Sequence, residues 1–171
     1  MALTKHAESI GCEGAAAVGP YYYHHCEDSV LEFYSSMVNA VGHEFPIYVY
    51  HNPTFSGYEI SLETMKKLKE KGVHGIKDAT FNILTFATYI RELSGDGFDI
   101  ALGTEALWLS ACGLGAEAYI PGLGNAFPEI CGRLYEEGMR NDTDTCRKTQ
   151  FEVNRIRDIM YIARSTQLSI Y

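Results

Sequence analysis

Short apolar runs alternate with helical patterns along this chain, and this alternation restricts the fold more than any other feature. Between the runs, apolar residues recur every three or four positions, which is typical of amphipathic helices. Strands alternating with helices predict β-α-β units, with parallel strands and right-handed crossovers. The apolar runs span residues 14–19, 45–50, 73–77, 98–103 and 116–121.

The helical segments carry start and stop signals. Ser61 precedes one pattern and Gly72 follows it, which is how many helices begin and end. The last helix is expected from about residue 143 to 163, with its apolar residues on one stripe. That stripe is expected to comprise Phe151, Ile156, Ile159 and Met160.

Two architectures fit five such units. A five-stranded doubly wound parallel sheet suits a chain of 171 residues. A (β/α)₈ barrel has eight strands and needs about 250 residues. Length alone favours the doubly wound sheet, whereas the candidate functional residues favour the barrel.

Charge and hydropathy exclude several classes of protein. The net charge of −8 and the pI of about 5.2 argue against nucleic acid as a partner. No apolar stretch is long enough to span a membrane, and residues 1–8 lack the apolar core of a signal peptide, so a cytoplasmic location is expected. The five cysteines form no C-x-x-C pair, and His24-His25-Cys26 has no second cluster of ligand spacing, so no metal site is expected.

Lys77 ends an apolar run in Gly75-Ile76-Lys77-Asp78. Strands covered on both faces rarely tolerate a charge, and alternation places this lysine on the face of Gly75. If that face is a barrel interior, partial desolvation lowers the lysine pKa and frees the amine to attack a carbonyl. The alternative is a structural lysine that extends into solvent from the strand end.

Tyrosines lie at the end of one preceding run and just after the end of the run before it. Tyr50 ends its run as Lys77 ends the next, so the two side chains are expected within reach of each other, where a phenol can relay protons. Tyr21, Tyr22 and Tyr23 are consecutive, and at least one is expected to project across the strand ends or into a subunit interface. Packing roles remain the alternative for all of them.

In this order, these motifs resemble the dihydrodipicolinate synthase and N-acetylneuraminate lyase superfamily of class I aldolases. The resemblance covers nearly the whole chain, and the lysine motif with the tyrosine one strand earlier is its most specific part. The matching segments are Gly19-Pro20-Tyr21-Tyr22, residues 48–53 with Ser56-Gly57, Gly75-Ile76-Lys77-Asp78, Gly103-Thr104-Glu105 and residues 124–129.

The resemblance implies a fold and a set of roles. Residues 1–140 would be strands four to eight of a (β/α)₈ barrel, and residues 141–171 the start of a C-terminal helical region. Lys77 would form a Schiff base with a 2-oxo acid of the pyruvate type, Tyr50 would move protons, and Tyr22 would act in a neighbouring subunit's site of a homo-oligomer. No metal or organic cofactor is implied. The substrate-binding residues would be Gly103, Thr104, Glu105 and the backbone at Ile120.

The chain also departs from the family pattern. The G-T-T-G-E motif of an earlier strand is absent, so the chain is expected to be a central fragment with open sheet edges, prone to self-association and of little activity alone. Phe55 stands where the synthase branch has an arginine that binds a second carboxylate. The expected function is therefore a 2-keto-3-deoxy sugar-acid aldolase or dehydratase. The alternatives are 4-hydroxy-tetrahydrodipicolinate synthase and a non-catalytic remnant.

Overall fold

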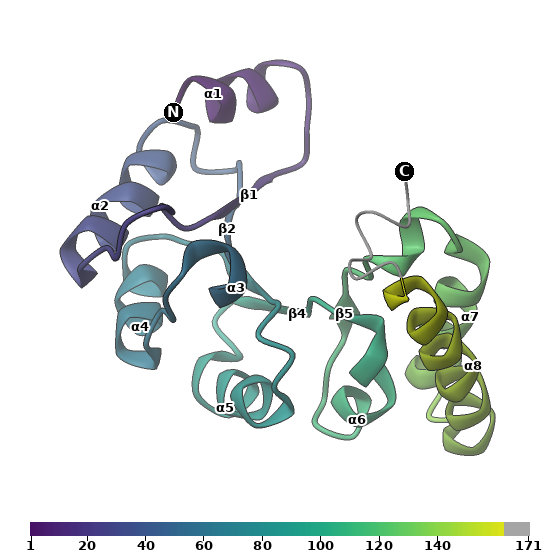
Figure 1. Ribbon diagram of the computed structural model, residues 1–171. Helices are drawn as coiled ribbons and strands as arrows, with labels where there is room; N and C mark the ends of the chain where they lie inside the picture. Colours follow the sequence, from purple (N-terminus) through teal and green to yellow (C-terminus); the bar gives the residue numbers. More distant parts are fainter. Residues whose placement is uncertain (163–171) are drawn as a thin grey trace. The chain divides into compact units, whose positions relative to one another are not determined.

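The computed structural model describes residues 1–162, in which strands and helices alternate (Figure 1). The strands coincide closely with the five predicted apolar runs. They are β1 (Ala15–Val18), β2 (Ile47–His51), β3 (Gly75–Asp78), β4 (Asp99–Leu102) and β5 (Ala118–Tyr119). The α-helices are α1 (Ala2–Ser9), α2 (Glu27–Val38), α3 (Pro53–Ser56), α4 (Leu62–Glu70), α5 (Ile83–Leu93), α6 (Trp108–Cys112), α7 (Pro128–Met139) and α8 (Thr143–Tyr161). The short 3-10 helices are η1 (Glu105–Leu107) and η2 (Leu123–Asn125).

The strands lie in the sheet in their chain order, β1-β2-β3-β4-β5, with β1, β2 and β3 parallel and β4 parallel to β5. A doubly wound sheet reverses its strand order at a switch point. An order that follows the chain, with right-handed crossovers, is instead that of consecutive strands in a barrel. The doubly wound alternative is therefore wrong, and this α/β fold corresponds to part of a (β/α)₈ barrel.

The chain forms two compact units, each with its own core. The first comprises Met1–Thr80 with Arg91–Ile100, and the second comprises Phe81–Ile90 with the residues from Ala101 onward. This division passes through α5 and β4, whereas the predicted domain boundary lies at residue 140. Fully buried core residues of the first unit include Ile47, Val49, Met65 and Leu68, and those of the second include Trp108, Leu134 and Val153.

Alternation along β2 separates the two faces of the sheet in the first unit. Ile47, Val49 and His51 are buried, whereas Tyr48 and Tyr50 are half-buried. The buried face is the one that the helices cover, and the Tyr34 hydroxyl of α2 donates a hydrogen bond of 2.9 Å to the Ala17 carbonyl of β1. The half-buried face carries the residues with candidate chemistry.

Local sequence signals explain the segment between β2 and β3. The Asn52 side chain accepts a hydrogen bond from the Phe55 N–H, and Pro53 occupies the first turn of α3. Gly57 ends this short helix with φ of 83°, a left-handed conformation that glycine adopts without strain. The predicted cap of α4 is confirmed, because the Ser61 side chain accepts from the Thr64 N–H at 3.1 Å.

The predicted apolar stripe of α8 is wrong in part. Phe151 and Ile159 are exposed, whereas Met160 is buried. The face that packs on the second unit carries smaller and polar side chains instead: Cys146, Thr149, Gln150, Val153 and Met160 are its buried residues. At 100° per residue, positions 151 and 160 lie on opposite sides of a helix, so they cannot share one stripe. The predicted end of this helix, at residue 163, lies outside the described residues.

The half-buried face of the sheet is closely packed around Gly75, and a substitution at this position tests that packing. A Cβ atom at this position would lie 2.4 Å from the Asp99 carbonyl oxygen and 2.9 Å from the Tyr48 ring. We expect Gly75→Ala to lower the free energy of unfolding by about 2–3 kcal/mol, because backbone must move to admit the methyl group. Urea denaturation measures the change.

The matched control is Gly132→Ala in α7, where the added methyl group meets nothing within 4 Å. Alanine is the better helix former there by about 0.5–1 kcal/mol, so this variant should be slightly more stable than the parent chain. Equal stability of Gly75→Ala and the parent chain would contradict the packing described for β2, β3 and β4.

Candidate active site

Parallel pairing of β2 with β3 brings the two predicted chemical residues together. Tyr50 and Lys77 are register partners at the carboxyl ends of their strands. The Lys77 Nζ atom lies over the Tyr50 ring, 4.0 Å from its centroid, which is a favourable contact between an ammonium and an aromatic face. Both side chains are half-buried, so solvent and a small molecule can reach them.

Two residues earlier along each of the two strands, on the same face of the sheet, the contacts are structural. Tyr48 is the register partner of Gly75, and its hydroxyl donates a hydrogen bond of 2.7 Å to Asp99 Oδ2. Burial and the neighbouring Asp99 carboxylate raise the pKa of Tyr48 to about 12. Tyr48 therefore remains a protonated donor, while the Tyr50 hydroxyl makes no hydrogen bond within residues 1–162.

The opposite face of the same strand ends holds two buried polar residues, His51 and Asp78, which are also register partners. His51 Nε2 accepts a hydrogen bond of 3.1 Å from the Ile60 N–H, and burial lowers the pKa of His51 to about 4. Asp78 Oδ1 accepts from the Thr80 N–H at 3.0 Å, and burial raises the pKa of this carboxyl. These bonds hold the chain segments that follow Tyr50 and Lys77.

Tyr22 is the most exposed of the three consecutive tyrosines, at 84%. Its backbone has φ of 83°, a left-handed conformation that costs a bulky residue energy. Its ring packs edge-on against Tyr23, with 4.8 Å between the ring centroids. The Tyr22 side chain is thus largely open to solvent, and its described ring contact is with Tyr23 rather than with Lys77 or Tyr50.

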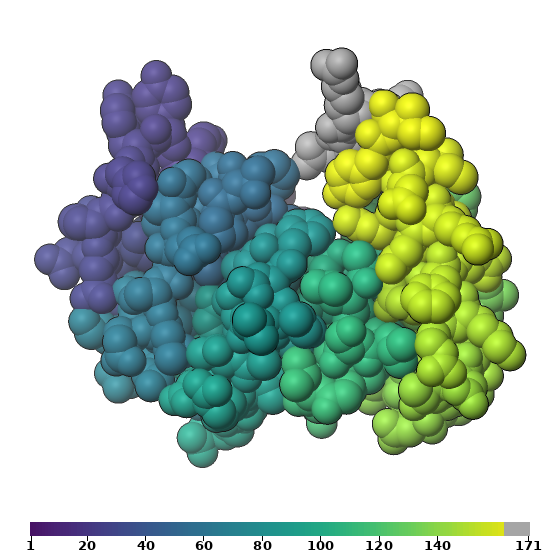
Figure 2. Space-filling model, turned by 60° about the horizontal axis from the view of Figure 1, so that its bottom comes forward, coloured from purple at the N-terminus to yellow at the C-terminus, as the bar shows by residue number. Residues whose placement is uncertain are grey.

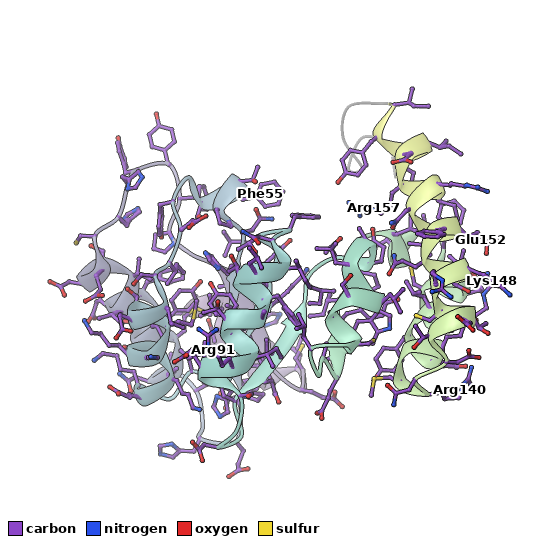
Figure 3. All side chains as sticks on the ribbon, turned by 90° about the horizontal axis from the view of Figure 1, so that it is seen from below. Phe55, Arg91, Arg140, Lys148, Glu152 and Arg157 are labelled. Carbon is purple, nitrogen blue, oxygen red and sulfur yellow. The ribbon has the colours of Figure 1, made fainter. Side chains whose placement is uncertain are left out.

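In the second unit, Thr104 and Glu105 are buried and hydrogen-bonded within the fold. Thr104 Oγ1 accepts from the Ala106 N–H at 3.2 Å at the start of η1. The Glu105 carboxylate forms an ion pair with Arg157 of α8, the residue labelled in Figure 3, and accepts a hydrogen bond of 3.3 Å from the Leu123 N–H. Arg157 in turn lies over the rings of Phe81 and Tyr161, 5.8 and 5.1 Å from their centroids.

Gly103 and Ile120 are more open to solvent than the buried Thr104 and Glu105. Gly103 is half-buried and Ile120 is 47% exposed. The Ile120 N–H donates a hydrogen bond of 2.8 Å to the Leu102 carbonyl, so a substrate carboxylate would have to compete with this bond for the same N–H. The backbone group at Ile120 that this bond leaves available is the carbonyl.

Sequence reasoning did not identify His51, Asp99 and Arg157 as part of these arrangements. Tyr48 and Tyr50 share a face by strand alternation, so the sequence did carry a signal for a second tyrosine beside the candidate pair. The Arg157–Glu105 ion pair joins residues 52 positions apart, and no local pattern indicates it.

Among residues 1–162, no three His, Cys, Asp or Glu side chains lie close enough together to hold a metal ion. His24 and His25 lie near the Tyr58 ring instead, and Cys26 Sγ is 3.3 Å from Ser29 Oγ. None of the described helices combines the length and the apolarity that crossing a membrane requires.

A family model and the sequences of curated proteins both match this chain, and they indicate the same family. The model of the dihydrodipicolinate synthetase family matches residues 1–170. A 4-hydroxy-tetrahydrodipicolinate synthase of Methanococcoides burtonii is 30% identical over 152 residues, which cover 88% of this chain and 52% of that protein. The corresponding enzyme of Methanothermobacter thermautotrophicus is 27% identical over 95% of this chain and 58% of its own length. The chain therefore spans about half the length of the curated relatives it matches.

Solved structures agree on the fold. Dihydrodipicolinate synthase from Aquifex aeolicus superposes with a TM-score of 0.86 at 26% identity, over 94% of this chain and 55% of that one. A variant of Sulfolobus solfataricus 2-keto-3-deoxygluconate aldolase superposes with a TM-score of 0.87 at 23% identity, over 99% of this chain and 56% of that one. The second likeness is one of fold alone.

His51 makes stability depend on pH. Its folded pKa of about 4 lies below the unfolded value of 6.5, so its stabilising contribution is present above pH 6.5 and is lost as the pH falls through the folded pKa. The shift corresponds to at most about 3 kcal/mol. The pKa of the Asp78 carboxyl is raised by burial, so its contribution to stability changes with pH in the opposite direction. The cost of burying its charge disappears as the pH falls and the carboxyl becomes protonated.

We therefore expect His51→Gln to flatten the fall in stability between pH 6.5 and 4.5. The glutamine amide oxygen can accept the Ile60 N–H bond at every pH, whereas imidazolium cannot. Urea denaturation of both proteins at several pH values measures the difference. The same slope in the parent chain and in His51→Gln would show that the buried imidazole does not set this pH dependence.

Proposed function

The chain belongs to the dihydrodipicolinate synthetase family, and on that premise we propose that Lys77 forms a Schiff base with a 2-oxo acid of the pyruvate type. The activity proposed is that of a class I lyase acting on a 2-keto-3-deoxy sugar acid, by aldol cleavage or dehydration. The pairing of Lys77 with Tyr50 at the carboxyl ends of β2 and β3 carries this proposal, since active sites of barrels lie at that end of the strands.

The chemistry follows from the two side chains. The free amine of Lys77 adds to the keto carbon, and loss of water gives an iminium ion. In aldol cleavage, the bond between the third and fourth carbons breaks, and its electron pair moves into the iminium to give an enamine. Tyr50 first gives its proton to the carbinolamine hydroxyl, which leaves as water, and the resulting phenolate takes the proton of the hydroxyl on the fourth carbon as the aldehyde departs. Tyr50 then returns this proton to the third carbon of the enamine, and water hydrolyses the iminium that forms, which releases pyruvate and the free amine.

Tyr50 is better suited than Tyr48 to carry the proton. The Tyr48 hydroxyl is hydrogen-bonded to Asp99 and has a raised pKa, whereas the Tyr50 hydroxyl has no hydrogen-bond partner in the described chain.

The roles proposed for the other site residues follow the family resemblance. Tyr22 would relay protons in a neighbouring subunit of a homo-oligomer, Gly103, Thr104 and Glu105 would line the distal part of the pocket, and the protein would work in the cytoplasm.

Phe55 bears on the choice of substrate. It lies on α3, directly after β2, and its side chain is 48% exposed (Figure 3). A phenyl ring cannot pair with a carboxylate, so this position favours a sugar acid over aspartate semialdehyde. The alternative is the 4-hydroxy-tetrahydrodipicolinate synthase reaction, which the names of the two curated relatives support.

The first test of this function is trapping of the imine. The chain is incubated with pyruvate, reduced with borohydride and digested. We expect the peptide containing Lys77 to gain the mass of pyruvic acid less one oxygen atom. Trapping detects the covalent step even where turnover is slow.

Two variants sharpen the trapping experiment. Lys77→Arg keeps the charge over the Tyr50 ring but cannot form the imine, and should lose the label. Tyr50→Phe keeps the ring and should still be labelled, while turnover of a substrate falls about 10²–10⁴-fold because no phenol moves the proton. Label on another lysine, with Lys77 unmodified, would overturn the assignment.

The second test separates the two substrates through Phe55. Loss of a charged hydrogen-bonding partner costs about 1.5–3 kcal/mol, so aspartate semialdehyde should be used roughly tenfold to a hundredfold less efficiently than by an arginine-bearing site. We expect Phe55→Arg to raise kcat/KM for condensation of pyruvate with aspartate semialdehyde and to leave imine formation unchanged. High efficiency of the parent chain with this acceptor, above that with sugar acids, would favour the synthase.

A further inference from the structure

The amino ends of β2, β3 and β4 border an open cavity of about 880 Å³, which we call the amino-end cavity. Its volume lies within the range of small-molecule sites, about 300–1,000 Å³. Its lining comes from the carboxyl ends of α2, α4 and α5 and from residues just before the strands, among them Phe45, His74 and Phe98. The described residues that line it all belong to the first unit. Figure 2 shows two of these helices at the surface, α4 in blue and α5 in teal.

Apolar side chains supply one part of the lining, and they can hold the apolar body of a ligand. Each square ångström of apolar surface that a ligand removes from water contributes about 25 cal/mol. The apolar residues of the lining are Val38, Val41, Phe45, Val73, Leu93 and Phe98.

Lys69 is one of two ammonium groups in the described lining, and the fold already uses its charge. Lys69 Nζ donates to the Leu93 carbonyl at 3.0 Å and to the Gly95 carbonyl at 3.1 Å. The same atom lies 3.7 Å from Asp96 Oδ2 and 5.5 Å from the centroid of the Phe98 ring. With two carbonyls, a carboxylate and an aromatic ring around it, this ammonium is a poor site for an anionic ligand.

Lys66 is the second ammonium group, and it also has partners. Its Nζ atom lies 3.3 Å from Glu92 Oε2 and 3.5 Å from Glu63 Oε1. Glu70 follows Lys66 by four residues, a spacing at which the two side chains can pair on a helix, but Glu70 takes part in no ion pair within residues 1–162. The described lining therefore holds three carboxylates and two ammonium groups, and the Glu70 carboxylate is the one left uncompensated.

The helix ends add to the negative potential of the cavity. α2 ends at Val38, α4 at Glu70 and α5 at Leu93, and all three residues line the cavity. A helix carries a partial negative charge at its carboxyl end, so the α4 dipole disfavours a carboxylate at Glu70. A side chain that opposes its local electrostatics is the kind of conflict that is expected at functional sites. A cation bound in the cavity would remove this conflict.

We propose that the amino-end cavity binds an organic amine, with its ammonium group beside the Glu70 carboxylate and its apolar body against the apolar part of the lining. The ammonium is attracted by the carboxylate and by the three helix ends, and the body removes apolar surface from water. An anion would meet the same negative groups and be repelled. A metal ion does not fit this role, because no three ligating side chains of residues 1–162 lie close enough together to hold one.

This site is separate from the proposed chemistry. The Lys77–Tyr50 pair lies at the carboxyl ends of β2 and β3, whereas the amino-end cavity lies at the opposite ends of the same strands. A change at Glu70 should therefore alter amine binding and leave borohydride trapping of pyruvate at Lys77 unchanged, so the two proposals can fail independently.

Three probes with the same aromatic ring and different charges test the site: 2-phenylethylamine, 2-phenylethanol and phenylacetate. None contains a keto group that can form an imine with Lys77. Isothermal titration calorimetry is run at about pH 8, where primary amines are charged and ordinary imidazoles are neutral. We expect 2-phenylethylamine to bind in the millimolar range or more tightly, 2-phenylethanol to bind at least about tenfold more weakly, and phenylacetate not to bind.

Two substitutions at Glu70 test the position of the ammonium group. Glu70→Gln removes the charge with little change in size and should weaken binding of 2-phenylethylamine about two- to fivefold, the range of exposed ion pairs. Glu70→Lys puts a like charge at the site and should weaken it more than about tenfold. The α4 dipole favours both variants over glutamate, so their melting temperatures should equal or exceed that of the parent chain. Weaker binding by an equally stable variant excludes misfolding as its cause.

Glu117→Gln and Glu117→Lys are the matched controls. Glu117 is exposed, belongs to the second unit and forms no ion pair within residues 1–162. These variants change the net charge by the same amounts and should bind 2-phenylethylamine like the parent chain. The amide chemical shifts of Gly72 and Gly97, which line the cavity, should change when the amine is added.

Four results would each overturn the proposal. They are absence of amine binding, binding of 2-phenylethanol or phenylacetate as tight as that of the amine, equal effects of the Glu70 and Glu117 variants, and chemical-shift changes confined to residues outside the cavity. The third result would assign amine binding to the general negative charge of the chain.

Discussion

The parallel register of β2 with β3 is the interaction on which the site depends. It places Tyr50 beside Lys77 and, two residues earlier, Tyr48 beside Gly75. Because strands alternate their faces, this register brings the phenol and the amine together on one face and His51 and Asp78 together on the other. A slip by one residue would exchange these sets, bury the ammonium under the helices and expose the imidazole.

Glycine and tyrosine make this register specific. The absence of a side chain at Gly75 leaves room for the Tyr48 ring and the Asp99 backbone, and the Tyr48–Asp99 hydrogen bond then ties β2 to β4. On the buried face, the imidazole and carboxyl at the strand ends accept backbone N–H groups from the loops that follow. The loops after Tyr50 and Lys77 are thereby fixed by bonds that lie outside the candidate site.

The sequence predicted the order of strands and helices, the α4 cap and the proximity of Tyr50 and Lys77. These depend on local pattern and on parallel neighbours, both of which are visible in one sequence. It did not predict the Arg157–Glu105 ion pair, because that contact depends on how α8 packs against η1. It also misplaced Phe151 and Ile159, since composition shows that a residue is apolar but only packing decides which side of a helix is covered.

The central claim is that the amine of Lys77 and the phenol of Tyr50 act together at the carboxyl ends of β2 and β3. A crystal structure of the chain after incubation with pyruvate and reduction with borohydride tests it most directly. The account predicts continuous density from Lys77 Nζ to the former keto carbon, with the Tyr50 hydroxyl next to the bound group. Density on a different lysine, or a Tyr50 hydroxyl turned away from the adduct, would contradict it.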